Sequence, residues 1–515
     1  MARFARYLRP GLPRDSGKDT SVIQPVWHYS FILSNLKPKI INALKWSTLS
    51  EVVARVATPI FFLVLAKILT PEDYGVAAIA TIVVSLAQVV GEAGMGKALI
   101  QRKGDIAAAS DVAFWSNLLL GSILYLGIFA FSSYFAVFFK DSRVTNVLRV
   151  QGLQIVIATL STVPMALCQR ELNYKLLFWV RLITTVVPGA VAIFLALRGF
   201  DYWSLVVSSL TSSALQCLAL FGLVAWRPSL SFDYQIGRQL LVYSKWVLGE
   251  GLLTWFYIWA DSAIIAYFLS SHELGVYRTG SLFISTAYAI IFSPIIAVLF
   301  SGLARLQDET SQFNKYFLYC SKFIVIVCLP VAMIFFCVPE LFASLLFGDK
   351  WTGIEYVIMV IGLAQGLSWT ISSHSEAFRA VGRPDVSSKI MGLCFLYYLP
   401  AYIVSSQYGL EAFLWTKLFL ALTTLPIYFI TTNKFLKINM ISFFSDIKYV
   451  VVGASVMGVV MWFVKTNIFL NKTLIHYALT IFAGLLVYFM FLLPHKQFIL
   501  GIYRSVFNRQ TPVEV

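Results

Sequence analysis

The chain alternates long apolar blocks with short polar connections along most of its length. Each block runs for roughly 18–27 residues, enough to cross a hydrocarbon layer of about 30 Å as an α-helix. A backbone inside lipid must satisfy its own hydrogen bonds, so such blocks fold as helices. We predict fourteen membrane-spanning helices, near residues 47–69, 75–98, 112–138, 148–168, 177–197, 202–225, 246–269, 279–303, 318–338, 354–377, 388–406, 410–432, 447–464 and 474–493.

The composition agrees with an all-α polytopic membrane protein. Of the 515 residues, 59% are hydrophobic and 13% are charged, and the mean hydropathy is +0.77. Soluble domains carry about 25% charged residues. The blocks also lack the apolar–polar alternation of membrane barrel strands. Because no connection between blocks exceeds roughly 20 residues, we expect no separate soluble domain.

The net charge of +15 could indicate nucleic-acid binding, but the placement of the basic residues indicates a membrane topology instead. Lysine and arginine collect in the N-terminal tail and in every second connection, for example at Lys97, Arg102 and Lys103. The other connections carry only scattered cations. This positive-inside bias predicts that both termini lie in the cytoplasm. We expect no nucleic-acid partner.

A weak internal repeat divides the chain. A shift of 200 residues lays LTPEDYGV (residues 69–76) on LSSHELGV (residues 269–276). Each copy holds six predicted spans, so the second copy begins on the same side of the membrane as the first. Parallel repeats of this kind are typical of alternating-access carriers. We predict two pseudo-symmetric six-helix lobes plus two C-terminal helices, with a basic cytoplasmic tail at 1–40, an N-lobe at 41–230, an interfacial linker helix at 231–245, a C-lobe at 246–433, the final two helices at 434–495 and a cytoplasmic tail at 496–515. The alternative for the linker is a plain start to the seventh span.

The segment GEAGMGKA (residues 91–98) matches the spacing of a phosphate-binding P-loop. Ala98, however, stands where a Ser or Thr would bind Mg²⁺, and an apolar helix rather than a strand precedes the segment. We expect no ATP here, and we interpret Gly91 and Gly94 as sites of close helix packing. The six cysteines and five histidines show no metal-ligand or disulfide spacing. We therefore expect no metal and no cofactor.

Ionisable side chains inside the predicted spans are the candidate site residues, because a charge in lipid needs a function or a partner. Glu51 and Arg55 lie four residues apart on one face of the first span, with Arg55 about 14 Å deep. A guanidinium binds phosphate in a bidentate manner, which favours Arg55 as an anion contact. The alternative is a structural ion pair with Glu51. Lys417 is a second candidate for substrate binding.

Acidic residues in the spans are candidates for ion coupling. Asp261 lies deep and has no close partner in the sequence, so it is the favoured coupling residue. Glu250 lies in the same predicted span, and Glu92 lies near the end of the second span. For Glu92 and Glu376 the alternative is contact with lipid headgroups or basic loops.

Aromatic residues gather ahead of Asp261 in TWFYIWAD (residues 254–261). Aromatic faces stack on sugar rings, so Trp255 and Tyr257 are candidate cavity residues. The alternative is plain packing between helices.

The stretch LAKILTPEDYGVAAIATIVVSLAQVVGEAGMGKALIQRKGD (residues 65–105) resembles the opening signature of bacterial polysaccharide flippases. In that family an LxPxxYG turn follows the first helix, and a glycine-rich step leads into ALIQRK after the second. The segments DVAFWSNLL, PMALCQRELNYK and LGVYRTG support the match. The chain is similar to Wzx-type polysaccharide transporters of the multidrug/oligosaccharidyl-lipid/polysaccharide flippase superfamily.

This resemblance implies fourteen helices, with two six-helix lobes around a central cavity, in the bacterial inner membrane. It implies an undecaprenyl-diphosphate-linked oligosaccharide as cargo, moved from the cytoplasmic to the periplasmic leaflet for O-antigen, capsule or exopolysaccharide biosynthesis. Membrane lipids, and polymerase or export machinery, are the implied partners. Cationic cavities in such flippases suit Arg55 as a contact for a diphosphate or an acidic sugar.

Two alternatives stay open. A cation-coupled multidrug exporter of the same superfamily would favour acidic residues over a buried arginine. A membrane polysaccharide polymerase or ligase would be an enzyme, and it would need a substantial extracytoplasmic loop. The short connections favour a transporter over an enzyme.

Overall fold

Among the residues that the computed structural model describes, fourteen helices are long and apolar enough to cross a membrane. Each overlaps one of the predicted spans, which confirms the all-α polytopic fold. The structure describes residues 26–438, 440–468 and 473–493, and no strand occurs among these residues. The predicted tail at 496–515 and most of the predicted tail at 1–40 lie outside the described residues.

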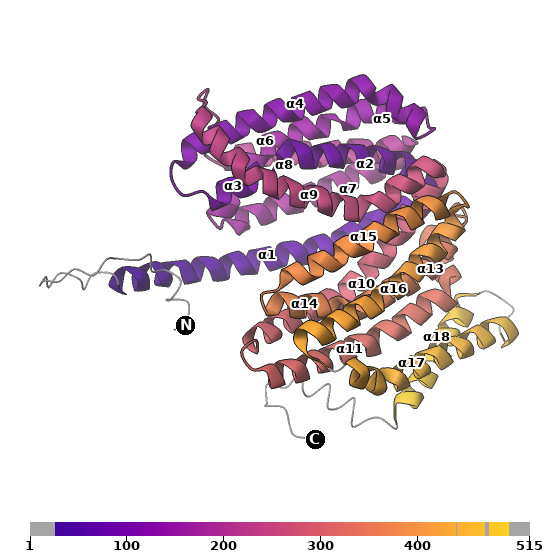
Figure 1. The fold of residues 1–515 in the computed structure, drawn as a ribbon. Helices are drawn as coiled ribbons and strands as arrows, with labels where there is room; N and C mark the ends of the chain where they lie inside the picture. Colours follow the sequence, from indigo (N-terminus) through magenta and orange to yellow (C-terminus); the bar gives the residue numbers. More distant parts are fainter. Residues whose placement is uncertain (1–25, 439, 469–472, 494–515) are drawn as a thin grey trace, which may run out of the picture.

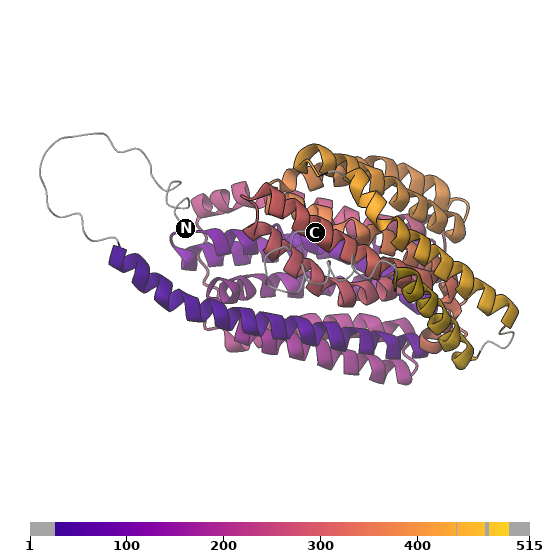
Figure 2. The same cartoon turned by 90° about the horizontal axis from the view of Figure 1, so that it is seen from below.

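The second to sixth spans form one group of helices in the upper half of Figure 1, and the first span, α1, runs below them. Two of these spans are broken into two helices each, at residues 93–94 and at Gly152. The first helix packs along α7, and Figure 2 shows it running on the outside of the bundle. The elements are α1 (Val26–Ile68), α2 (Pro71–Glu92), α3 (Met95–Gln101), α4 (Ile106–Phe138), α5 (Arg143–Gln151), α6 (Leu153–Arg170), α7 (Tyr174–Leu197) and α8 (Asp201–Leu223).

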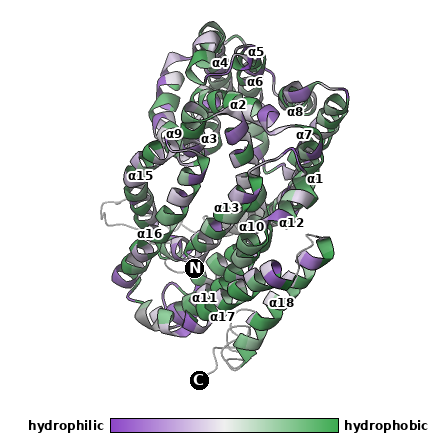
Figure 3. Ribbon diagram, turned by 90° about the vertical axis from the view of Figure 1, so that its right-hand side faces the viewer, coloured by the Kyte–Doolittle hydropathy of each residue, from purple (hydrophilic) through white to green (hydrophobic). Residues whose placement is uncertain are grey.

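The remaining spans form the second group and a C-terminal pair that packs on α11. Hydrophobic residues dominate the helices throughout (Figure 3), as expected for helices surrounded by lipid. The elements are α9 (Tyr234–Phe268), α10 (Ser271–Arg305), α11 (Thr310–Cys337), α12 (Pro339–Phe342), η2 (Ala343–Phe347), α13 (Ile354–Thr370), α14 (Ser372–Ala380), α15 (Pro384–Ser406), α16 (Leu410–Leu436), α17 (Met440–Phe463), η3 (Val464–Ile468) and α18 (Leu474–Leu492).

The linker expected at 231–245 is not a separate helix. Residues 234–268 form one continuous helix of 35 residues, α9, so the alternative of a plain start to the seventh span describes it better. Asp233 caps its first turn by accepting hydrogen bonds from the backbone of Gln235 and Ile236. No proline interrupts the sequence after that cap, so nothing ends the helix before the span begins.

The P-loop-like segment is a break between two helices. Ala93 and Gly94 adopt left-handed backbone conformations, with φ of 43° and 71°, and they separate α2 from α3. A Cβ atom on Gly94 would lie 2.6 Å from the side chain of Val247. Gly94 therefore allows the close helix packing that the sequence predicts, against α9.

The helices α2 and α10 begin in the same way at equivalent positions of the repeat. Thr70 and Asp73 form a capping box at the start of α2, and Ser270 and Glu273 form one at the start of α10. In each box the hydroxyl accepts from a backbone N–H, and the carboxylate accepts from the cap residue. The repeated turn thus fixes the starting point of both helices.

These two helices cross with their backbones in direct contact. A Cβ atom on Gly75 would lie 1.8 Å from the carbonyl oxygen of Ser271, and one on Gly275 would lie 1.8 Å from the carbonyl oxygen of Pro71. The contact is reciprocal, because the partners are repeat counterparts 200 residues apart. Only glycine permits so close an approach. We call this contact between α2 and α10 the seam; it joins the two lobes at one end of the bundle.

Replacing Gly75 by alanine should separate α2 from α10, because the new methyl group would overlap the Ser271 carbonyl. Overpacking of a core commonly costs about 1–3 kcal/mol in the free energy of unfolding. We therefore expect the melting temperature of the detergent-purified protein to fall by several degrees.

Gly222→Ala is the matched control, because a methyl group there meets nothing within 4 Å. Its melting temperature should equal or exceed that of the wild type, since alanine favours helix. If Gly75→Ala melts like Gly222→Ala, the seam is looser than described.

Candidate functional site

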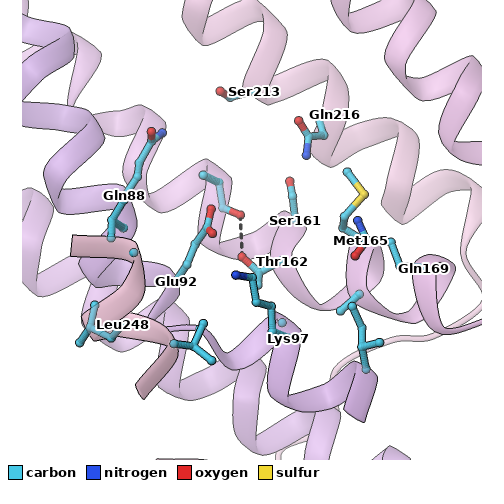
Figure 4. A pocket seen from close by; sticks show the side chains of 18 of the residues that line it. Gln88, Glu92, Lys97, Ser161, Thr162, Met165, Gln169, Ser213, Gln216 and Leu248 are labelled. Carbon is cyan, nitrogen blue, oxygen red and sulfur yellow. Dashed lines mark hydrogen bonds between the residues drawn. The ribbon is translucent and has the colours of Figure 1, made fainter. Parts of the chain in front are cut away.

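A polar cavity of ≈ 470 Å³ lies in the N-lobe where α2, α3, α6 and α8 face the first part of α9. Its walls carry a set of uncharged polar side chains, together with one acid and one base (Figure 4). The cavity lies at the end of the bundle opposite the seam, because α2 begins at the seam and ends at the cavity. Because the lysines and arginines of the alternate connections lie at this end, we call it the basic end. The polar lining residues are Gln88, Glu92, Lys97, Gln154, Ser161, Thr162, Gln169, Ser213 and Gln216.

Of the predicted ion-coupling residues, Glu92 lines this cavity and Glu250 lies near it. The Glu92 side chain points into the space that the labelled residues surround in Figure 4. Glu250 lies nearby on α9, with its carboxylate 3.9 Å from the ammonium group of Lys97. Both members of that pair are well exposed, so their interaction is weak.

Asp261, Tyr277 and Lys417 form a compact cluster in the C-lobe, contributed by α9, α10 and α16. The Lys417 ammonium and the Tyr277 hydroxyl each donate to Oδ2 of Asp261 at 2.5 Å. The ammonium also donates to the Tyr277 oxygen at 2.5 Å. Two predicted site residues from helices far apart in sequence therefore meet and neutralise each other's charge.

This cluster is largely shielded and lies close behind the seam. The side chains of Lys417 and Asp261 are 26% and 17% exposed. Asp261 is about 10 Å from the end of α9 at Phe268, at about 1.5 Å per residue. The backbone N–H of Ser262 donates to Oδ1 of Asp261 at 2.6 Å. Both carboxylate oxygens are therefore engaged.

Arg278 lies beside this cluster and is a site residue that the sequence patterns miss. Its guanidinium carbon is 3.9 Å from the centre of the Trp259 ring, a geometry in which the ring face attracts the cation. The apolar block that predicts this span starts at residue 279, which leaves Arg278 in a turn. The helix itself begins at Ser271, so Arg278 lies inside it.

Polar contacts between the lobes flank the seam. The Glu72 carboxylate lies 2.6 Å from Nδ1 of His272, its counterpart in the repeat. The Ser271 hydroxyl donates to Asp141 at 2.6 Å, and Arg143 donates to both oxygens of the same carboxylate. Burial alone would raise the pKa of Asp141, but the hydrogen bonds from Arg143 and Ser271 outweigh it and lower the pKa below its usual value. Asp141 thus stays ionised at neutral pH.

The segment after η2 adds two further contacts at the seam end. The Trp351 indole N–H donates to the carbonyl of Ala66 at 2.7 Å, and the Lys350 ammonium donates to the carbonyl of Ile68 at 3.1 Å. Both acceptors lie in the last turn of α1, where helix carbonyls lack partners within the helix. C-lobe side chains thus fix the end of α1, and the seam end is closed by several independent contacts.

The remaining predicted residues do not join either group. Arg55 and Glu51 form an ion pair at 3.0 Å, with side chains 40% and 60% exposed; neither residue lines the N-lobe cavity. Trp255 is buried and donates to the Ser85 hydroxyl of α2 at 2.9 Å, so it joins α9 to α2. Tyr257 is exposed.

Two further expectations concern Glu376 and a metal site. Glu376 pairs with Arg379 one turn away on α14, at 2.9 Å. Among the described residues no group of three or more His, Cys, Asp or Glu side chains is placed to hold a metal ion. The expectation of no metal therefore stays a prediction.

The fold and the site define a two-lobed, all-helical membrane protein with a polar cavity in one lobe and a charge cluster in the other. Comparison with known proteins agrees with this class. The sequence profile of the polysaccharide biosynthesis protein family matches residues 64–355, more than half of the chain. The chain therefore belongs to this family, which confirms the predicted resemblance to Wzx-type polysaccharide transporters.

Individual relatives are distant but cover much of the chain. The succinoglycan biosynthesis transport protein ExoT of Rhizobium meliloti (strain 1021) is 23% identical over 66% of this chain and 69% of its own length. The lipopolysaccharide biosynthesis protein WzxC of Escherichia coli (strain K12) is 23% identical over 72% of this chain and 76% of its own. The solved structure of the lipid II flippase MurJ in an inward closed conformation has the same fold, with a TM-score of 0.68 at 12% identity; the match covers 88% of this chain and 100% of that chain.

Replacing Lys417 by methionine should destabilise the protein, because the shielded Asp261 carboxylate would lose its cation. Removing one partner of a buried pair costs about 3–5 kcal/mol. The double variant Asp261→Asn/Lys417→Met removes both charges and should recover most of that loss. Melting temperatures of the wild type, the single variant and the double variant in one detergent measure this coupling.

The Arg383/Asp385 pair is the control, since its side chains are 50% and 42% exposed and exposed pairs contribute little to stability. Arg383→Met/Asp385→Asn should melt close to the wild type. Additive losses in the Asp261/Lys417 double variant would contradict the pairing.

Proposed function

We propose that this protein is a flippase that moves an undecaprenyl-diphosphate-linked oligosaccharide repeat unit from the cytoplasmic to the periplasmic leaflet by alternating access. Its product would serve a surface polysaccharide such as O-antigen, capsule or exopolysaccharide. The observation that carries the proposal is the combination of a sealed seam at one end with a polar cavity at the other. A carrier that is open on one side only has this arrangement. Family membership supports a polysaccharide precursor as the cargo.

The basic end is proposed to face the cytoplasm. The lysines and arginines of the alternate connections lie there, in agreement with the positive-inside rule. With this orientation both termini are cytoplasmic, the membrane is the bacterial inner membrane, and the N-lobe cavity loads from the side on which lipid-linked sugars are assembled. Polymerase or export machinery would receive the cargo on the opposite side.

The charged candidates take separate roles in this proposal. Arg55 lies near the middle of the spanning part of α1, which packs along α7 on the outside of the bundle (Figure 2). It contacts the diphosphate, and Glu51 holds the guanidinium until the cargo arrives. Tyr257 offers an exposed ring for stacking on a sugar.

Ion coupling is assigned to the acidic residues. Asp261 is the main candidate, because its carboxylate is held by Lys417, and a change in the charge of either group would loosen the contact between α9 and α16. Glu92 and Glu250 are the candidates at the basic end. No step in this proposal makes or breaks a covalent bond, so the chain acts as a carrier rather than as an enzyme.

Deleting the gene should cause single undecaprenyl-linked repeat units to accumulate on the cytoplasmic leaflet, because synthesis continues while translocation stops. The measurement is mass spectrometry of lipid-linked sugars, with leaflet location reported by cleavage with an impermeant glycosidase in spheroplasts. Expression of the wild-type chain should restore the normal distribution. An unchanged distribution together with increased drug sensitivity would instead identify a drug exporter.

Replacing Arg55 by alanine should abolish export at normal protein abundance, because the diphosphate would lose its bidentate contact. Arg55→Lys should restore export only in part, since an ammonium acts as a point charge. Glu51→Gln is the matched control: it removes the ion pair but leaves the guanidinium, so export should persist. Full export by the alanine variant would refute the role of Arg55.

A further inference from the structure

The N-lobe cavity displays amide groups that the described part of the protein leaves without hydrogen-bond partners. They belong to Gln88, Gln154, Gln169 and Gln216, which line the cavity from α2, α6 and α8. An amide without a partner in an apolar surrounding costs about 1–3 kcal/mol, so such groups face water or a ligand. In Figure 4 the Gln216 amide points towards the middle of the cavity, opposite Gln88 and Glu92.

The hydroxyl groups of the cavity add acceptors. Those of Ser161, Thr162 and Ser213 donate to carbonyl groups of their own helices at 3.2–3.3 Å. Each hydroxyl oxygen keeps lone pairs for a second partner. Together with the amides, the walls present donors and acceptors side by side, as a polyhydroxylated ligand requires.

The cavity carries no net positive charge. Its lining holds one carboxylate, Glu92, and one ammonium, Lys97, and Lys97 already lies 3.9 Å from the exposed Glu250. The cavity therefore has no excess of positive charge with which to hold a diphosphate or a uronic acid, groups that are recognised by charge-assisted hydrogen bonds. An uncharged ligand avoids this mismatch.

We propose that this cavity binds an uncharged, hydroxyl- and acetamido-bearing sugar segment of the cargo, and that the anionic diphosphate is held elsewhere. The proposal rests on the flippase function and specifies its substrate class. Acetamido and hydroxyl groups pair with glutamine amides in both senses, and the apolar side chains of Val89, Met165 and Leu248 offer surface to the C–H faces of a ring. The volume of ≈ 470 Å³ lies within the range of about 300–1,000 Å³ found for small-molecule sites.

The test measures binding of soluble glycans to the full chain in lipid nanodiscs. The probes are an array of neutral oligosaccharides that includes N-acetylated ones, the same sugars with one hexose replaced by its uronic acid, and inorganic pyrophosphate. The site variants are Gln154→Leu and Gln216→Leu. The control is Ser212→Ala, one turn from Gln216 on α8, whose hydroxyl donates to the Thr184 carbonyl of α7 and does not line the cavity.

We expect the wild type and Ser212→Ala to bind neutral glycans in preference to their acidic counterparts. The double glutamine variant should lose roughly tenfold or more in affinity, since each lost hydrogen bond contributes about 1 kcal/mol. Gln216→Lys should shift the preference towards acidic glycans, which a merely structural role would not do.

Three results would overturn the proposal: no binding of any neutral glycan, tighter binding of acidic glycans or pyrophosphate, or glutamine variants that bind like the wild type. A failure of the proposed flippase function would be detected in a different measurement, the distribution of lipid-linked sugars after deletion of the gene. If the wild type binds neutral glycans through these glutamines while its deletion leaves lipid-linked sugars normally distributed, the cavity assignment stands and the flippase assignment falls.

Discussion

The whole arrangement depends on one contact in which two helix backbones touch. At Gly75 and Gly275 each helix meets a carbonyl oxygen of the other at a distance that no side chain would permit. In lipid, where apolar side chains gain little by leaving the solvent, close packing of small residues is a main source of helix association. Because the contact is reciprocal across the repeat, it relates the two lobes symmetrically. The lobes are thus joined at one end, and the cavity lies at the other.

The two lobes handle polarity in opposite ways. In the C-lobe, Asp261, Tyr277 and Lys417 satisfy one another within a single cluster, and a satisfied network in a low dielectric holds its helices in one arrangement. In the N-lobe, the amides of residues such as Gln154 and Gln216 have no partner among the described residues. The charged groups of the C-lobe cluster pair with one another, whereas the N-lobe cavity exposes neutral polar groups. In the proposed function, the C-lobe cluster would respond to charge and the N-lobe cavity would recognise the cargo.

The fold was predictable from the sequence because membrane spans are local: a long apolar block needs no distant partner to be a helix. The seam was predictable only in part. The repeated turn placed Gly75 and Gly275 at equivalent positions of the repeat, but only the fold shows that their helices touch there. The pairing of Asp261 with Lys417 joins residues 156 positions apart, and neither pattern nor spacing predicts such a contact. Arg278 was hidden because a helix can begin before its apolar block does. The cavity glutamines were not predicted from the sequence. A glutamine indicates a binding site only when the fold shows that nothing pairs with its amide.

The continuous helix α9 connects the N-lobe cavity with the C-lobe cluster. It carries Leu248 at the wall of the cavity and Asp261 in the C-lobe cluster. The stretch between them holds no proline but includes Gly249 and Gly251. Trp255 lies between Leu248 and Asp261, and its indole N–H donates a hydrogen bond to Ser85 of α2. This contact fixes the middle of α9 to α2. In the proposed mechanism, a tilt of α9 at the cavity wall would change the position of Asp261 relative to Lys417. Binding in one lobe and the ion pair in the other are thus connected through one continuous helix, without an intervening loop.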